Sequence, residues 1–170
     1  MKDLIFDQND IPKDKWRYGL RPSAATGCGW IATHNALCLM GHDSEPEELI
    51  RWYERSLPII NGNFGTFIFS IKAFFALRGF RTVMTAKASK LDAAVKNCDA
   101  AILFYRWKKK MKFGSHYVTV QYKNGRYVGL NAFTGSKDFE DYGLSLESFL
   151  KKRGYFGPIL LAITDNGGRK

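Results

Sequence analysis

A cysteine, a histidine and an asparagine in this sequence have the types and placement needed for nucleophilic chemistry. Cys28 lies between Gly27 and Gly29, where the sequence predicts the start of a helix. A helix start presents unpaired backbone N–H groups and the positive end of the helix dipole, and both favour the reactive thiolate. The two glycines let a substrate backbone approach the sulfur. The backbone N–H of Cys28 faces the position where an oxyanion would form, so we predict that Cys28 is a nucleophile.

A cysteine nucleophile needs an imidazole, and the sequence contains three histidines. His34 lies on the same predicted helix, about 240° around its axis from Cys28, and therefore points elsewhere. His42 follows the end of that helix, far from the sulfur. His116 opens a predicted strand directly after Ser115, where a side chain can face a cleft. We therefore predict that His116 is the general base.

An imidazole that acts as a base needs a partner for its other nitrogen. Asn124-Gly125 is a strong hairpin signal, and it places opposite each other residues whose numbers sum to about 249. His116 would then face residue 133, and Asn131 would lie diagonally adjacent on the same face of the sheet. We predict that the side-chain amide of Asn131 orients the ring, although a bulge would change this pairing.

Each of these residues also has a structural interpretation when it is taken alone. A cysteine on an apolar helix is commonly a small core residue, and this is how we interpret Cys38 and Cys98. A lone histidine often has a structural role, and an asparagine in a strand can mark a bend. The three cysteines lack the close spacing of zinc ligands, so we expect no metal and no cofactor. The combined placement favours a Cys–His–Asn site.

Predicted helices come first along the chain and most predicted strands come later. The expected helices cover residues 26–40, 45–57, 66–78, 91–98 and 146–153. The expected strands cover residues 80–86, 100–107, 116–123, 126–133 and 158–164. This order predicts an α+β fold, in which an N-terminal helical half packs on a C-terminal antiparallel sheet. The helix that carries Cys28 is apolar on nearly all sides, so we expect it to be buried.

Composition and length set the general class of the protein. The chain has 170 residues, of which 45% are hydrophobic, so we expect one folded domain over residues 1–170 with an irregular arm at 1–19. Three cysteines do not make a disulfide framework. No segment approaches a membrane span, and the N-terminus lacks the pattern of a signal peptide. We therefore expect a cytoplasmic protein without a membrane span.

Twenty-six basic and 16 acidic residues give a net charge of +10, and five cations lie in residues 106–112, just before His116. The simplest interpretation of this run is a solvated loop between two strands. Beside a catalytic His116, the run would line the rim of the cleft and attract acidic peptides. Tyr105 and Trp107 could stack on bases, but no nucleic-acid motif is visible. We therefore expect a peptide or protein substrate, with acidic character, and no nucleic acid.

Three segments, in this order, resemble the papain-like cysteine peptidases: TGCGWIATHNALCLMG, GSHYVTVQ and VGLNAF. They are most similar to compact bacterial members, including the peptidase domains that process bacteriocin leaders. Over about residues 20–164, the resemblance implies a central helix that begins at Cys28 and packs on an antiparallel sheet. It implies that Cys28 is the nucleophile, His116 the general base and acid, and Asn131 the residue that holds the ring. The implied reaction is attack of the thiolate on a carbonyl, followed by hydrolysis of the acyl-enzyme.

The sequence departs from the family pattern at the oxyanion hole. The family glutamine six positions before the cysteine falls at Pro22, which has no side-chain donor. Losing one such donor typically lowers the rate by ~10²–10³. Ser23, Thr26, the N–H of Cys28, or a residue such as Asn63 are the candidates to replace it. Residues expected to line the cleft are Gly27, Gly29, Trp30, Asn63 and Ser115.

Three functions remain open from the sequence. The first is a thiol hydrolase that cleaves peptide bonds. The second is an acyl transferase or amidase, which would share the first half of the reaction. The third is a papain-like module that binds a peptide or protein without cleaving it, and the missing glutamine favours this third function.

Overall fold

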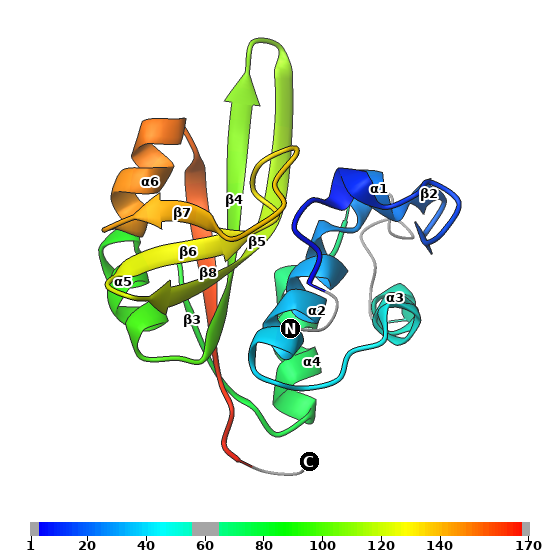
Figure 1. The fold of residues 1–170 in the computed structure, drawn as a ribbon, viewed down its shortest axis with the longest axis horizontal. Helices are drawn as coiled ribbons and strands as arrows, with labels where there is room; N and C mark the ends of the chain where they lie inside the picture. Colours follow the sequence, from blue (N-terminus) through cyan, green and yellow to red (C-terminus); the bar gives the residue numbers. More distant parts are fainter. Residues whose placement is uncertain (1–3, 56–64, 168–170) are drawn as a thin grey trace.

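The computed structural model describes residues 4–55 and 65–167, and its central feature is an antiparallel sheet (Figure 1). Six strands are hydrogen-bonded in the order β3-β8-β4-β5-β6-β7. The hairpin of β4 and β5 extends beyond the rest of the sheet, at the top of Figure 1. The strands are β3 (Arg81–Thr85), β4 (Ala100–Lys109), β5 (Lys112–Lys123), β6 (Arg126–Leu130), β7 (Glu140–Gly143) and β8 (Phe156–Thr164).

Helices cover both faces of this sheet, with α2 and α4 on one side and α5 and α6 on the other (Figure 1). The helices are α1 (Ser23–Thr26), α2 (Cys28–Leu39), α3 (Pro46–Arg55), α4 (Ile68–Leu77), α5 (Ala88–Lys96) and α6 (Leu146–Arg153). The short elements of the N-terminal arm and the segment after it are η1 (Gln8–Asp10), β1 (Arg17–Tyr18) and β2 (Arg21–Pro22). The α+β class is confirmed. The arrangement differs from a helical half stacked on a sheet, because later helices cover the second face.

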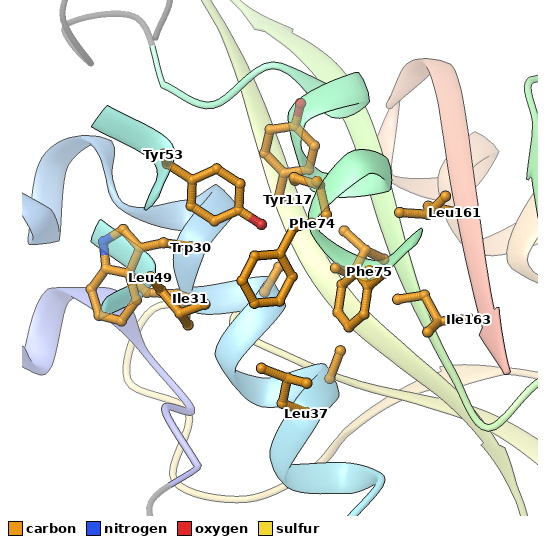
Figure 2. Close-up of a cluster of buried hydrophobic side chains, with 14 of the residues drawn as sticks. Trp30, Ile31, Leu37, Leu49, Tyr53, Phe74, Phe75, Tyr117, Leu161 and Ile163 are labelled. Carbon is orange, nitrogen blue, oxygen red and sulfur yellow. The ribbon is translucent and has the colours of Figure 1, made fainter. Parts of the chain in front are cut away.

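The core between α2, α4 and the sheet fixes the position of α2 (Figure 2). Large side chains fill it without exposure, and burying one such side chain stabilises the fold by about 1.5–3 kcal/mol. Thr119 of β5 also donates a hydrogen bond of 3.0 Å to the carbonyl of Ala32 in α2. The start of α2 is therefore held at one place beside β5. The core residues drawn in Figure 2 include Trp30, Ile31, Leu37, Tyr53, Phe74, Phe75, Leu161 and Ile163.

The hairpin between β5 and β6 has the register that Asn124-Gly125 predicts. Thr119 pairs with Leu130, and Lys123 pairs with Arg126. Beyond Leu130 the ladder ends, because Asn131 takes a φ of 70°, in the left-handed region that asparagine tolerates better than most residues. β6 therefore turns away from β5 before it reaches His116. Within the described residues, β5 therefore has no pairing with β6 before Thr119.

One predicted helix start is wrong. Ser89 and Asp92 have the spacing of a capping box, which would start the helix expected over residues 91–98. In the structure α5 begins at Ala88, and its N-cap Lys87 makes no side-chain cap. The Asp92 carboxylate instead accepts a hydrogen bond of 2.7 Å from the backbone N–H of Leu146. This contact joins α5 to the start of α6. The Asp92 carboxylate therefore makes a tertiary hydrogen bond in place of a local cap on its own helix.

Within the part of the chain that the structure describes, no helix has the length and apolar character needed to cross a bilayer.

Candidate active site

Cys28 is the first residue of α2, and Gly27 is the N-cap. Its thiol accepts hydrogen bonds from three backbone N–H groups, those of Tyr117, Gly29 and Cys28 itself. The N–H of Tyr117 is available because β6 has already left β5 at this point. The sulfur is therefore surrounded by main-chain donors from two different elements.

The thiol is neutral in the structure without substrate. Burial raises the pKa of Cys28 to about 11, even though the three N–H groups act to lower it. The prediction that the helix start makes Cys28 a thiolate is therefore wrong for the free protein. Desolvation disfavours the charged form more than the dipole and the donors favour it.

Cys28 lines a cavity of about 520 Å³ between α1, the segment around Thr66 and the β4–β5 hairpin. The cavity wall carries aromatic and aliphatic groups together with two arginines, so a peptide could reach the sulfur along a largely apolar surface. Its other lining residues include Arg21, Thr26, Phe67, Phe104, Arg106, Phe113, Ser115 and Ile159.

His116 lies on β5, one residue before the Tyr117 N–H that reaches the sulfur. Its Nε2 is 2.5 Å from the backbone carbonyl oxygen of Asn131. A carbonyl only accepts hydrogen bonds, so Nε2 carries the proton and Nδ1 presents a lone pair. Burial lowers the pKa of His116, while the Asn131 carbonyl and the charge of Asp7 act to raise it. The ring is therefore a neutral imidazole in the tautomer that suits a base.

Asn131 contacts His116 through its main chain, whereas the sequence predicts a contact through its side-chain amide. The side-chain Oδ1 accepts a hydrogen bond of 2.8 Å from the backbone N–H of Gln8, and Nδ2 lies 3.4 Å from the Gln8 side-chain oxygen. The positive φ of Asn131 turns its carbonyl toward the ring and its amide toward the N-terminal arm. An asparagine in a strand can mark a bend, and Asn131 does so here. This bend directs its carbonyl to the imidazole.

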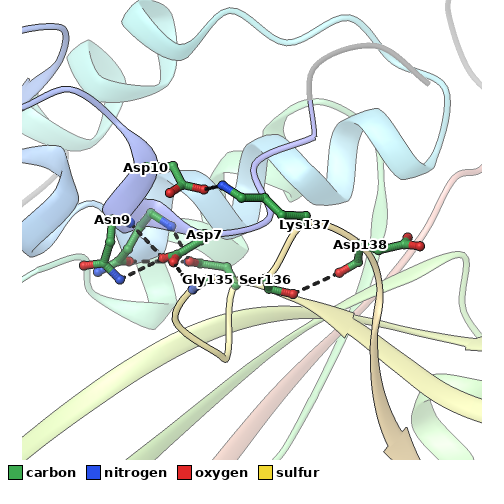
Figure 3. A network of polar contacts seen from close by, with 9 residues as sticks. Asp7, Asn9, Asp10, Gly135, Ser136, Lys137 and Asp138 are labelled. Carbon is green, nitrogen blue, oxygen red and sulfur yellow. Dashed lines mark hydrogen bonds and ion pairs between the residues drawn. The ribbon is translucent and has the colours of Figure 1, made fainter.

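The N-terminal arm supplies a buried carboxylate near His116. Asp7 is 3% exposed and accepts hydrogen bonds from the N–H and side chain of Asn9 and, at 2.5 Å, from the N–H of Gly135 (Figure 3). Burial acts to raise its pKa, but these hydrogen bonds outweigh it, and the pKa of Asp7 is lowered. Asp7 is therefore ionised, and its charge favours a protonated His116.

Other contacts hold the arm in this place. Lys137, in the loop between β6 and β7, forms an ion pair of 2.5 Å with Asp10 of the N-terminal arm (Figure 3). The Gln8 side chain donates a hydrogen bond of 3.0 Å to the carbonyl of Ala24, just before the active-site helix. Sequence reasoning missed Asp7 and Gln8 because the arm has no periodicity. The polar run Asp7-Gln8-Asn9 between apolar residues is the signal that was available.

Cys28 and His116 lie on different sides of the β4–β5 hairpin. Ser115 and Tyr117 line the cavity of Cys28, whereas His116 lines a second cavity of about 670 Å³. No hydrogen bond joins the sulfur to the imidazole among residues 4–55 and 65–167. The Cys28 sulfur thus contacts the main chain of β5 one residue after His116, while the two side chains line separate cavities.

The remaining candidates divide into cavity residues and core residues. Thr26 and Ser115 line the cavity of Cys28. Ser23 is fully buried and accepts a hydrogen bond of 3.2 Å from the Trp30 indole, which is also fully buried. Neither side chain is free to contact a substrate. Asn63 lies outside the described residues.

The two glycines beside Cys28 have a packing role. A Cβ at Gly29 would lie 2.4 Å from the Thr66 side chain, and one at Gly27 would lie 2.5 Å from the Ser23 carbonyl oxygen. Neither position has space for a larger residue. The absence of a side chain thus permits α2 to start close to α1 and to Thr66, which the sequence interpretation did not foresee.

Comparison with known proteins agrees with this fold. No family model matches the sequence, and no curated protein is detectably similar to it. Nine chains of solved structures match. One of them is the peptidase domain of Streptococcus ComA, a bi-functional ABC transporter involved in a quorum-sensing pathway. It is 18% identical with a TM-score of 0.55, over 86% of this chain and 98% of that chain. The chain therefore shares the α+β fold of that peptidase domain.

Proposed function

We propose that the protein is a cysteine-dependent peptidase that forms an acyl-enzyme on Cys28. The observation that carries this proposal is the position of the Cys28 sulfur. It lies at the start of the central buried helix, it opens to a cavity of about 520 Å³, and it contacts three backbone N–H groups. A buried cysteine with a purely structural role needs neither the cavity nor the donors.

The chemistry starts from a neutral pair, because the pKa of Cys28 is about 11 and burial lowers the pKa of His116. Cys28 and His116 line separate cavities in the structure, so the imidazole must come into contact with the thiol before its Nδ1 lone pair removes the thiol proton. The sulfur attacks the carbonyl carbon as this proton leaves. The S–C bond forms, and the carbonyl electrons move to the oxygen. The backbone N–H of Cys28 is a donor for this oxyanion.

Breakdown of this intermediate releases the first product. The C–N bond breaks, and the imidazolium of His116 returns its proton to the leaving amine. The Asn131 carbonyl and the ionised Asp7 stabilise the imidazolium in the interval. Water then attacks the thioester with His116 as base, which releases the acid and restores the thiol.

Acyl-enzyme trapping tests the proposal. The protein is incubated with a peptide library, quenched in acid and measured by intact mass, with cleavage sites read from the released peptides. We expect an acyl adduct on Cys28 that is lost in Cys28→Ala and retained in the matched control Cys38→Ala. Adducts of equal yield in the wild type and Cys28→Ala, or no cleavage at any peptide, would contradict the proposal. Added amines distinguish a transferase, since they would capture the acyl group in place of water.

A peptide-binding module without catalysis is the second candidate. Two observations favour it, the neutral thiol and the absence, within the described residues, of a hydrogen bond between Cys28 and His116. In that case Cys28→Ser would leave peptide affinity unchanged, and no peptide would be cleaved by the wild type.

A further inference from the structure

The two cavities at the end of β5 share one wall. Side chains of the β4–β5 hairpin alternate between them, so Phe104 and Arg106 face the cavity of Cys28, whereas Tyr105 and Trp107 face the cavity of His116. The closed end of the hairpin stands clear of the rest of the sheet (Figure 1). A peptide that crosses this wall would therefore have one part in each cavity.

The order of the chemical steps assigns one part of the substrate to each cavity. This assignment rests on the proposed function. The acyl part stays bound to the Cys28 sulfur, so it lies along the cavity of Cys28. The leaving amine receives its proton from His116, so the segment that it carries must lie beside that ring. The cavity of His116 is thus the site of the leaving segment.

The cavity of His116 is lined by three cations, Lys108, Lys109 and Arg153, and by one acid, Asp7. Asp7 is already occupied by the N–H groups of Gly135 and Asn9. Within residues 4–55 and 65–167, none of the three cations is paired with a carboxylate. The ammonium of Lys108 lies 5.0 Å from the centre of the Phe113 ring, which lines the cavity of Cys28. The charges of Lys109 and Arg153 are therefore the ones available to a ligand in the cavity of His116.

An aromatic ring positions Arg153. The Arg153 guanidinium lies 4.3 Å from the centre of the Phe133 ring, and Phe133 also lines the cavity. A guanidinium stacked on a ring keeps its N–H edge free and presents a planar fork that matches a carboxylate. The cavity of Cys28 also carries two cations, Arg21 and Arg106, but five of its lining residues are large and apolar.

We infer that the cavity of His116 binds a carboxylate of the leaving segment, with Arg153 and Lys109 as its partners. The carboxylate belongs either to an aspartate or glutamate side chain or to the C-terminus of the substrate. Lys109 and Arg153 are thus specificity determinants for one side of the scissile bond.

Peptide-library cleavage by three proteins tests this inference. They are the wild type, Arg153→Glu and Lys151→Glu. Lys151→Glu is the matched control, because it makes the same change of charge on the same helix, at an exposed residue that does not line the cavity. We expect the wild type to prefer acidic over neutral leaving segments by about tenfold at low salt, with a smaller preference at high salt. Arg153→Glu should abolish the preference and Lys151→Glu should keep it. Lys109→Gln is a second variant, which should weaken the preference without reversing a charge.

Peptides with amidated and free C-termini separate the two sources of the carboxylate. A preference that vanishes on amidation assigns the site to the chain terminus, and one that persists assigns it to acidic side chains. Equal cleavage of acidic and neutral leaving segments would overturn the inference and leave the proposed peptidase intact. A preference confined to the acyl side, or an equal effect of both charge reversals, would also overturn it. Failure to cleave any peptide would overturn the proposed function and this assignment with it.

Discussion

Each end of α2 carries a cysteine with a histidine nearby. The two pairs differ in whether the thiol contacts the imidazole. At the C-terminal end, the Cys38 sulfur lies 3.7 Å from Nε2 of His34, one helical turn away, and His34 Nδ1 lies 3.0 Å from the Ser44 hydroxyl. At the N-terminal end, Cys28 makes no hydrogen bond to His116 among the residues that the structure describes. The pair in direct contact is the one that sequence reasoning set aside.

This difference shows that contact between a thiol and an imidazole does not by itself define a reactive site. Cys38 lies at the negative end of the helix dipole, which disfavours a thiolate and an oxyanion. The nearby cavity is lined by His34 and Ser44 but not by Cys38. The Cys28 sulfur has backbone N–H donors and lines a cavity of about 520 Å³. A substrate can therefore meet the thiol at the N-terminal end.

The largest expected effect comes from removing each thiol in turn. Cys28→Ala should lower kcat/KM for peptide cleavage by at least ~10⁴-fold, because it removes the nucleophile. Cys38→Ala should change it by no more than about twofold. Both variants are compared on the best peptide from the library. Equal losses in the two variants would remove the distinction between the two ends of α2.

Removing each imidazole should separate catalysis from stability. His116→Ala should lower kcat by ~10²–10⁴-fold through the loss of the base. His34→Ala should instead reduce the free energy of unfolding by about 0.5–1.5 kcal/mol, because it removes the contacts of the ring with the half-buried Ser44 and Cys38. Urea unfolding and steady-state kinetics measure the two effects. A loss of activity in folded His34→Ala would show that the C-terminal pair takes part in the reaction.

The pH dependence of alkylation sharpens the account of the Cys28 thiol. Since its pKa is about 11, the thiolate fraction rises with pH throughout the neutral range. The rate of iodoacetamide labelling at Cys28 should therefore rise about 100-fold between pH 7 and pH 9. Peptide mapping by mass spectrometry gives the rate for each cysteine. A plateau reached below pH 7 would indicate a thiolate–imidazolium pair instead of the neutral pair.

The smallest expected effect concerns the arm. Asp7→Asn removes a negative charge that raises the pKa of His116, so the acid limb of the kcat profile should move to lower pH. The rate should fall by about tenfold, because the imidazolium loses stabilisation. Asp10→Asn is the matched control, since Asp10 pairs with exposed Lys137 on the surface. Identical pH profiles for wild type and Asp7→Asn would exclude Asp7 as a positioning residue.

Asp7 also links stability to pH. Its pKa is lowered in the folded protein from an ordinary value of 3.8. Its stabilising contribution is therefore complete above that value and is lost as the pH falls through the lowered folded value.

The sequence by itself determined the features that depend on neighbouring residues. The glycine-flanked Cys28 marks the start of an all-round apolar helix, which can only be buried. Asn124-Gly125 sets the β5–β6 register, and Gly154, with a φ of 68°, ends α6 where predicted. These features follow from local backbone preference and from the periodicity of apolar residues, both of which can be read along the chain.

Tertiary structure alone decided the environment of the site. The contact between Asp7 and Gly135 joins residues 128 positions apart, and no local sequence pattern predicts it. The carbonyl of Asn131, not its amide, reaches His116 because the arm binds the amide. The neutral state of Cys28 likewise reflects how much water the packed elements exclude from the sulfur. Desolvation depends on everything that surrounds a group, whereas the sequence names only the group itself.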